Sequence, residues 1–212
     1  MMIIRTEKAS DYKSIYDFVK NAFETAEVKD GHEQDLVNRL RKSNKYIPEL
    51  ALVAEIESKI IGYIMISKTY VIQEGQRFEG LLLAPLAVDI NYRNQKVGSQ
   101  LIQKATEIAK QMEYKAIFLA GNPAYYNRFG FSPTIDYGIK CSMDIPEELY
   151  PNIMVLELFP NALKGIQGIV DLSGEETPEI SQEENDLSEE ENINISESQN
   201  DNDIIHTFTH MQ

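Results

Sequence analysis

The 212-residue sequence predicts an α+β domain in which a mixed β-sheet is covered by helices. Two observations support this fold class. Apolar runs typical of strands and amphipathic runs typical of helices follow one another without strict alternation. A strand, a tight polar loop and a helix come together within residues 81–112. No run approaches about 18 apolar residues, so no membrane span is predicted.

The first 71 residues are predicted to form two helices and three strands. A short apolar strand opens the chain, and an amphipathic helix capped by Ser10 or Asp11 follows. A second short helix precedes two antiparallel strands joined by a tight turn. The predicted elements are strands at Met2–Arg5, Leu50–Ile56 and Ile60–Val71, helices at Ser10–Phe23 and Glu33–Arg41, and a turn at Glu57–Lys59.

The strand predicted at Leu81–Val88 is apolar almost throughout, as expected for a strand that is covered on both faces. Pro85 lies in its middle, and proline cannot donate to a sheet ladder. A β-bulge at Pro85 would leave neighbouring backbone groups unpaired and able to bind an extended ligand. The alternative is a slightly irregular core strand with no binding role.

The loop Asp89–Ser99 leads into a helix with an anion-binding character at its start. Gly98 lies in the first turn, where a missing side chain allows close approach to the backbone. Arg93 and Lys96 add positive charge beside free N–H groups and the positive end of the helix dipole. The loop therefore predicts a pyrophosphate site, and the alternative is a loop whose cations are simply solvated. The apolar side of the helix follows the 3.6-residue period through Val97, Leu101, Ile102, Ala105, Ile108, Ala109 and Met112.

Three further elements complete the predicted domain. Ala116–Ala120 is expected to be a strand, and Asn122 is a favourable N-cap for a helix that begins at Pro123. Ile153–Phe159 is expected to form another strand. A segment with several glycines then marks the end of the domain near Leu172.

The formal net charge of −14 is unevenly distributed along the chain. Residues 173–212 hold twelve of the 34 acidic residues and none of the 20 basic ones, so residues 1–172 are nearly neutral. The sequence therefore predicts one domain at 1–172 and a disordered acidic C-terminal tail at 173–212. The tail fits a solubilising extension or a segment that docks a basic partner. Its Glu-rich stretch and apolar end also resemble C-terminal signals of secreted bacterial effectors.

Composition also excludes several classes of function. Cys141 is the only cysteine, which excludes an intramolecular disulfide, fits a reducing cytosol and favours a packing role for the thiol. With three scattered histidines, no metal site is expected. No secretory signal is visible, so a cytoplasmic location is predicted. The phosphate-loop and dinucleotide motifs are missing and the domain has no basic excess, which argues against binding of nucleotides and nucleic acids.

Residues 93–98 resemble the acyl-CoA-binding motif of the GNAT acetyltransferases, Arg/Gln-x-x-Gly-x-Gly/Ala, with Arg93 and Gly98 at matching positions. Lys96 replaces the middle glycine of the motif, and lysine tolerates a positive φ poorly. The likeness extends over about residues 2–172 and points to the YhbS-like branch of that family. The segments that carry it are Glu33–Arg41, Leu52–Glu55, Pro85–Val88, Asn122–Phe131 and Leu156–Gly168.

The resemblance implies a GNAT fold, a central and mostly antiparallel twisted sheet flanked by helices. It also implies acetyl-CoA as co-substrate and direct transfer of the acetyl group to an amine, with no covalent enzyme intermediate and no metal. Tyr126 occupies the position of the acid that protonates the departing thiolate; the alternative is a core tyrosine in an aromatic cluster. The residues implied in cofactor binding are Leu86, Ala87, Val88, Arg93, Asn94, Gln95, Lys96, Val97, Gly98, Ser99 and Asn122.

The sequence assigns neither the general base nor the amine that accepts the acetyl group. Glu33, Glu79 and Asp89 are conceivable bases, but each is better interpreted as a surface acid, and none is assigned. In the GNAT architecture Phe23–Asn44 would shape the acceptor side, for an amine of a small molecule or a protein. The alternative function is an acyl-CoA-binding regulatory or secreted interaction protein with weak or lost catalysis. A monomer and a homodimer are both compatible with the sequence.

Overall fold

The structure is a computed structural model that describes residues 1–25 and 31–174. From residue 175 onward, the predicted acidic tail lies outside the described residues. Part of the predicted acceptor segment, residues 26–30, lies outside them as well.

The described strands form one sheet in the order β1-β2-β3-β4-β5-β8-β6, and β9 pairs with both β3 and β7. Most neighbouring strands are antiparallel, while β4–β5 and β7–β9 are parallel. The predicted mixed, mostly antiparallel sheet is therefore confirmed. The strands are β1 Ile3–Thr6, β2 Ala51–Ile56, β3 Lys59–Gln73, β4 Gln76–Val88, β5 Ala116–Ala120, β6 Ser132–Pro133, β7 Ile139–Cys141, β8 Ile153–Glu157 and β9 Gly168–Val170.

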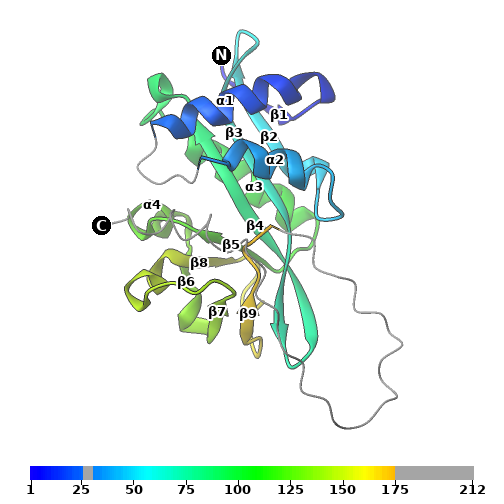
Figure 1. Cartoon of the computed structure of the whole chain (residues 1–212), viewed down its shortest axis with the longest axis vertical. Helices are drawn as coiled ribbons and strands as arrows, with labels where there is room; N and C mark the ends of the chain where they lie inside the picture. The colour runs from blue at the N-terminus through cyan, green and yellow to red at the C-terminus, as the bar shows by residue number, and fades with distance from the viewer. Residues whose placement is uncertain (26–30, 175–212) are drawn as a thin grey trace.

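Helices cover both faces of the sheet (Figure 1). Helices α1 (Tyr12–Glu24) and α2 (Glu33–Leu40) lie on one face, and α3 (Val97–Gln111) lies on the other. Strand side chains alternate between faces, so Tyr63 of β3 packs with α1 and α2 while Ile64 packs with α3. The short helix α4 (Pro123–Tyr126) follows β5 directly.

The structure differs from the sequence prediction mainly in the strands. Strand β3 continues to Gln73 and turns at Glu74–Gly75 into β4, which begins at Gln76 rather than at the predicted Leu81. Strand β8 ends at Glu157 instead of Phe159. The short strands β6, β7 and β9 were not predicted, because two or three residues show no periodicity.

A buried carboxylate ties β1 to α2 and β3. The side chains of Glu7 and Arg41 are 1% and 5% exposed. Arg41 donates to both carboxylate oxygens of Glu7, from Nε at 2.8 Å and from Nη2 at 2.7 Å. The hydroxyls of Tyr46 and Tyr63 donate to the same carboxylate at 2.8 Å each. Burial and the adjacent Glu7 raise the pKa of both hydroxyls, so both remain donors.

A second buried ion pair joins distant parts of the chain. The Lys45 side chain is 2% exposed, and its Nζ lies 3.0 Å from Oδ2 of Asp171, 126 residues later. Asp171 also accepts from the hydroxyl and the backbone N–H of Ser173. This pair fastens the segment after β9 to the loop before β2.

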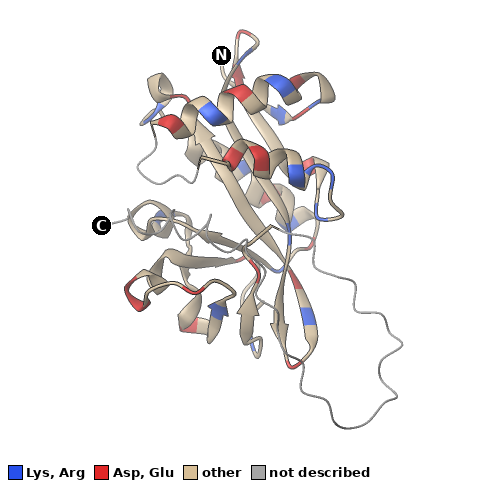
Figure 2. Ribbon diagram, in the orientation of Figure 1, with Lys and Arg blue, Asp and Glu red and all other residues tan. Residues whose placement is uncertain are grey.

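Charged residues of both signs are mixed over the described surface (Figure 2). Helices α1 and α2 show red and blue turns side by side, and neither presents a uniformly basic face. This distribution fits the nearly neutral balance predicted for the folded domain, and it does not resemble the basic stripe of a nucleic-acid-binding surface.

Candidate functional site

The sheet opens between β4 and β5. Their parallel pairing covers Leu81–Ile117 and Leu82–Phe118 within the described residues, while β5 stays paired with β8 as far as Ala120. Residues 83–88 of β4 therefore leave β5. We call the opening between residues 83–88 and residues 119–126 the split. Its β4 side leads into α3, and its β5 side leads into α4.

The β-bulge predicted at Pro85 is confirmed. The register between β3 and β4 shifts so that Ile64 pairs with Leu86 while Ile66 pairs with Leu83. Two β4 residues, Ala84 and Pro85, thus lie opposite Met65. Beyond the bulge, the backbone edge of Leu86–Val88 that is turned away from β3 borders the split and can bind an extended ligand.

The polar loop before α3 leads through a left-handed turn into the N-terminus of the helix. Asp89 begins the loop and accepts from the N–H of Asn91 at 2.9 Å. Asn94 and Lys96 both adopt positive φ, 62° and 65°. The first α-helical hydrogen bond runs from Gln100 N to Lys96 O, so the preceding N–H groups of residues 97–99 have no acceptor within the helix.

Lys96 keeps the backbone conformation that a glycine would adopt more easily. It is the N-cap of α3, with φ 65° and ψ 13°. The left-handed region costs a side-chain-bearing residue about 1–2 kcal/mol. The replacement of the motif glycine is therefore accommodated through local strain and leaves the turn in place.

Lys96→Gly is expected to be more stable than Lys96→Ala by about 1 kcal/mol, because only glycine relieves the strain. The free energy of unfolding in urea measures this difference. Glu113 at the other end of α3 has φ 63°, so the pair Glu113→Gly and Glu113→Ala is a matched control. Equal stability of Lys96→Gly and Lys96→Ala would contradict the strain at Lys96.

The side chain of Arg93 binds the end of α1. Its Nη2 donates to Ala22 O and to Thr25 Oγ1, each at 2.9 Å, and its Nη1 donates to Thr25 O at 3.2 Å. The sequence analysis predicted that the Arg93 cation helps to bind a pyrophosphate. In the structure its guanidinium instead holds α1 against the loop. The carbonyls at a helix C-terminus favour a cation in this place.

The contact of Arg93 depends on the forked shape of its guanidinium. We therefore expect Arg93→Lys to lose about as much stability as Arg93→Met, about 1 kcal/mol, because one ammonium cannot bind three separated oxygens. Urea unfolding of the two variants measures this. A Lys variant as stable as the wild type would show that positive charge alone suffices.

Helix α4 carries the aromatic residues on the β5 side of the split. The predicted N-cap is confirmed, since Asn122 Oδ1 accepts from Ala124 N at 2.8 Å and Pro123 is the first helical residue. The side-chain oxygen of Asn122 is thereby engaged in the cap. The structure thus confirms the capping role predicted for Asn122, while its predicted role in cofactor binding stays a prediction.

Tyr126 lies in the aromatic cluster of α4 and is packed against the main core. Its ring is 4.9 Å from the ring of Tyr125 and 5.7 Å from that of Phe131. The ring lies against Gly121, where a Cβ would collide with it. Burial and the neighbouring Tyr125 raise the pKa of the Tyr126 hydroxyl, which stays protonated well above neutral pH.

The three conceivable bases have different surroundings. Glu33 is 7% exposed at the start of α2, so its interpretation as a surface acid was wrong. Glu79 is exposed, and its Oε2 lies 3.4 Å from Lys68 Nζ. Asp89 binds Lys59 at 2.9 Å, and this hydrogen bond lowers the pKa of the Asp89 carboxyl, which makes it a weaker base.

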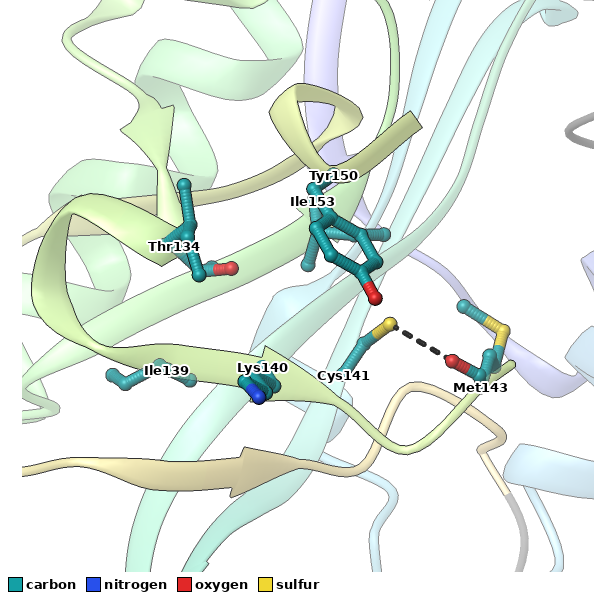
Figure 3. A pocket seen from close by; sticks show the side chains of 8 residues that line it. Thr134, Ile139, Lys140, Cys141, Met143, Tyr150 and Ile153 are labelled. Carbon is teal, nitrogen blue, oxygen red and sulfur yellow. Dashed lines mark hydrogen bonds between the residues drawn. The ribbon is translucent and has the colours of Figure 1, made fainter. Parts of the chain in front are cut away.

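A small cavity of about 60 Å³ lies beside β7 (Figure 3). Tyr150 points toward Cys141, whose thiol donates to Met143 O at 3.4 Å. Burial raises the pKa of this thiol, which fits the predicted packing role.

Among the described residues, no group of acidic, His and Cys side chains could hold a metal ion. No helix of the described part is long and apolar enough to cross a membrane.

Comparisons with known proteins agree on one family. Residues 12–131 match the model of the acetyltransferase (GNAT) family. The chain is 33% identical to the uncharacterized N-acetyltransferase YhbS of Escherichia coli K12 over 171 residues, which are 80% of this chain and 95% of YhbS.

Solved structures show the same fold. The structure of E. coli YhbS in complex with CoA matches with a TM-score of 0.70 and 30% identity, over 80% of this chain and 88% of that chain. A GNAT acetyltransferase from Brucella melitensis in complex with acetyl-CoA matches with a TM-score of 0.65 and 24% identity, over 80% of this chain and 94% of that chain.

Proposed function

The chain belongs to the GNAT acetyltransferase family, and we propose that it transfers the acetyl group of acetyl-CoA directly to a primary amine of a small molecule or protein. The observation that carries this proposal is the split, where a backbone edge of β4 that pairs with no described strand runs beside the amides of a helix N-terminus. The relatives that were solved with CoA and with acetyl-CoA support the choice of co-substrate.

The pyrophosphate of acetyl-CoA would bind at the start of α3. The free N–H groups of Val97, Gly98 and Ser99 and the positive end of the helix dipole supply the attraction, and the exposed Lys96 adds a charge of the right sign. Asn94 and Gln95 shape the turn that presents these amides. Arg93 contributes by fixing the turn to α1.

The thioester end would lie along β4 beyond the bulge. Backbone groups of Leu86–Val88 border the split there, and they are the candidates for holding the acyl arm and stabilising the oxyanion of the tetrahedral intermediate. A neutral amine attacks the thioester carbon, and the C–S bond breaks so that the CoA thiolate leaves. The amine nitrogen gives up its proton to water.

Tyr126 would assist the departing thiolate. A free phenol has a pKa of about 10 and a thiol about 8.5, so complete proton transfer costs about 2 kcal/mol before the effect of burial is added. Burial raises the Tyr126 pKa further, and burial would also destabilise a thiolate bound beside the hydroxyl. The hydroxyl therefore acts first as a hydrogen-bond donor to the sulfur as negative charge develops there.

A second candidate function is binding of acyl-CoA by a regulatory or interaction protein with weak catalysis. Lys96 favours it, since this residue replaces the middle glycine of the acyl-CoA motif and holds a positive φ there. Both candidates require the same binding site, and they differ in turnover.

The two functions are separated by an acetyl-CoA titration followed by a thiol-release assay. The titration uses calorimetry, and the assay covers amines and peptides at about pH 8.5, where more of each amine is neutral. Binding with thiol release on an amine is expected. Binding without release on any amine would favour the second function, and absence of binding would refute both.

Ser99→Asp tests the proposed phosphate site separately from the stability of the fold. An acidic residue in the first turn is favourable for a helix, so the fold should persist. The same charge repels a pyrophosphate, so binding of acetyl-CoA should be lost while the thermal melt remains that of the wild type.

A further inference from the structure

The two sides of the split touch each other at Gly98 and Tyr125. A Cβ placed on Gly98 would lie 2.6 Å from the hydroxyl oxygen of Tyr125, far inside contact distance. The same point lies 3.5 Å from Val88 Cγ2 and 3.8 Å from Leu86 Cδ2. The phenol end of Tyr125 thus occupies the space that a side chain at residue 98 would fill, above the β4 segment that borders the split.

This contact joins elements that the sheet does not hold together. Gly98 is in the first turn of α3, which follows β4, whereas Tyr125 is in α4, which follows β5. The paired residues of the two strands end at Leu82 and Phe118. A bridge across the open end limits how far the two sides can separate.

The ring of Tyr125 is held firmly enough to act as such a bridge. The guanidinium of Arg128 stacks on it at 4.1 Å, and the rings of Tyr126 and Phe129 lie at 4.9 and 5.6 Å. The backbone N–H of Tyr125 donates to Asn122 O at 2.9 Å. The hydroxyl cannot retreat from residue 98 unless the ring cluster or α4 moves with it.

We propose that Tyr125 is a positioning residue that clasps the two sides of the split and sets the width of the slot for the pantetheine arm of acetyl-CoA. This inference rests on the proposed function. The glycine at residue 98 then has two tasks, since its N–H belongs to the proposed pyrophosphate site and its missing side chain makes room for the Tyr125 hydroxyl. A slot of fixed width lowers the cost of ordering a flexible ligand.

The clasp is tested with a double-mutant cycle of Gly98→Ala and Tyr125→Phe. Gly98→Ala should raise the Kd for acetyl-CoA about tenfold, because the methyl group forces the hydroxyl and α4 away. Tyr125→Phe removes the colliding oxygen, so the double variant should lie within about threefold of Tyr125→Phe alone. In the steady state, Gly98→Ala should raise KM for acetyl-CoA more than it lowers kcat.

Two controls separate the clasp from loss of structure. Alanine is a better helix former than glycine, so Gly98→Ala should not weaken α3 itself. Gln103→Ala on the exposed side of the same helix should leave the Kd unchanged. Urea unfolding of the four cycle variants without ligand reports the coupling between residues 98 and 125 independently of binding.

The outcomes distinguish the inference from the function on which it rests. Suppose that the wild type binds acetyl-CoA and that Gly98→Ala and the double variant lose the same amount of affinity. This result would overturn the clasp and leave the proposed function intact. Wild-type Kd in Gly98→Ala would overturn it as well. A wild-type protein that does not bind acetyl-CoA would refute the proposed function, and absence of coupling in urea would then overturn the contact itself.

Discussion

Tyr126→Phe is expected to lower kcat about 100- to 10,000-fold while binding of acetyl-CoA is retained, because one general-acid group contributes an effect of this size. The substitution removes a single oxygen from a ring whose position is set by packing on Gly121, Tyr125 and Phe131. The ring should therefore stay in place, and the loss should fall on the chemical step. Single-turnover thiol release measures that step.

Tyr150→Phe is the matched control for Tyr126. It removes the same oxygen from a tyrosine in a different apolar cluster, beside the small cavity. Its kcat should equal that of the wild type. If Tyr126→Phe also turned over at the wild-type rate with intact binding, Tyr126 would have no part in the mechanism and would be a core tyrosine.

Glu7→Gln is expected to lower the free energy of unfolding by about 3–5 kcal/mol, because it leaves the buried Arg41 without its counter-charge. The amide NH₂ of glutamine would also replace one of the two carboxylate oxygens, so either the Tyr46 or the Tyr63 hydroxyl would face a donor in place of its acceptor. For a domain of this size the loss corresponds to a drop in Tm of roughly 6–20 °C. Urea unfolding and thermal melts measure both quantities.

An exposed ion pair supplies the comparison for Glu7. Lys13 and Asp17 form a pair at 2.8 Å with side chains that are 87% and 56% exposed. Water and salt screen such a pair, so Lys13→Ala should leave the melt unchanged. If Glu7→Gln had the same Tm as Lys13→Ala, the buried network would contribute little to the stability of the fold.

The elements that the sequence predicted best are those with long, regular patterns. The apolar period of residues 97–112 predicted α3 almost to the residue, and Pro85 predicted the bulge because proline has no N–H to donate. The cap of α4 followed from the side chain of Asn122 and the ring of Pro123. In each case the signal lies within a few residues of the feature.

The features that the sequence did not predict depend on contacts between distant residues. Arg93 binds carbonyls that lie 68 and 71 residues earlier in the chain, and its neighbours in the loop carry no sign of this. Glu33 resembles an ordinary acid in a first helical turn, and its burial follows only from how α2 packs. The contact of Tyr125 with Gly98 depends in the same way on how α4 lies across the split.

The pairing of Lys45 with Asp171 bears on the order in which the protein is completed during its synthesis. A ribosome adds Lys45 early and Asp171 only 126 residues later. Until then the ammonium would have no counter-charge inside the protein and would be better placed in water. The part of the nascent domain around Lys45 should therefore stay open until β9 and Asp171 have been made and have left the ribosome.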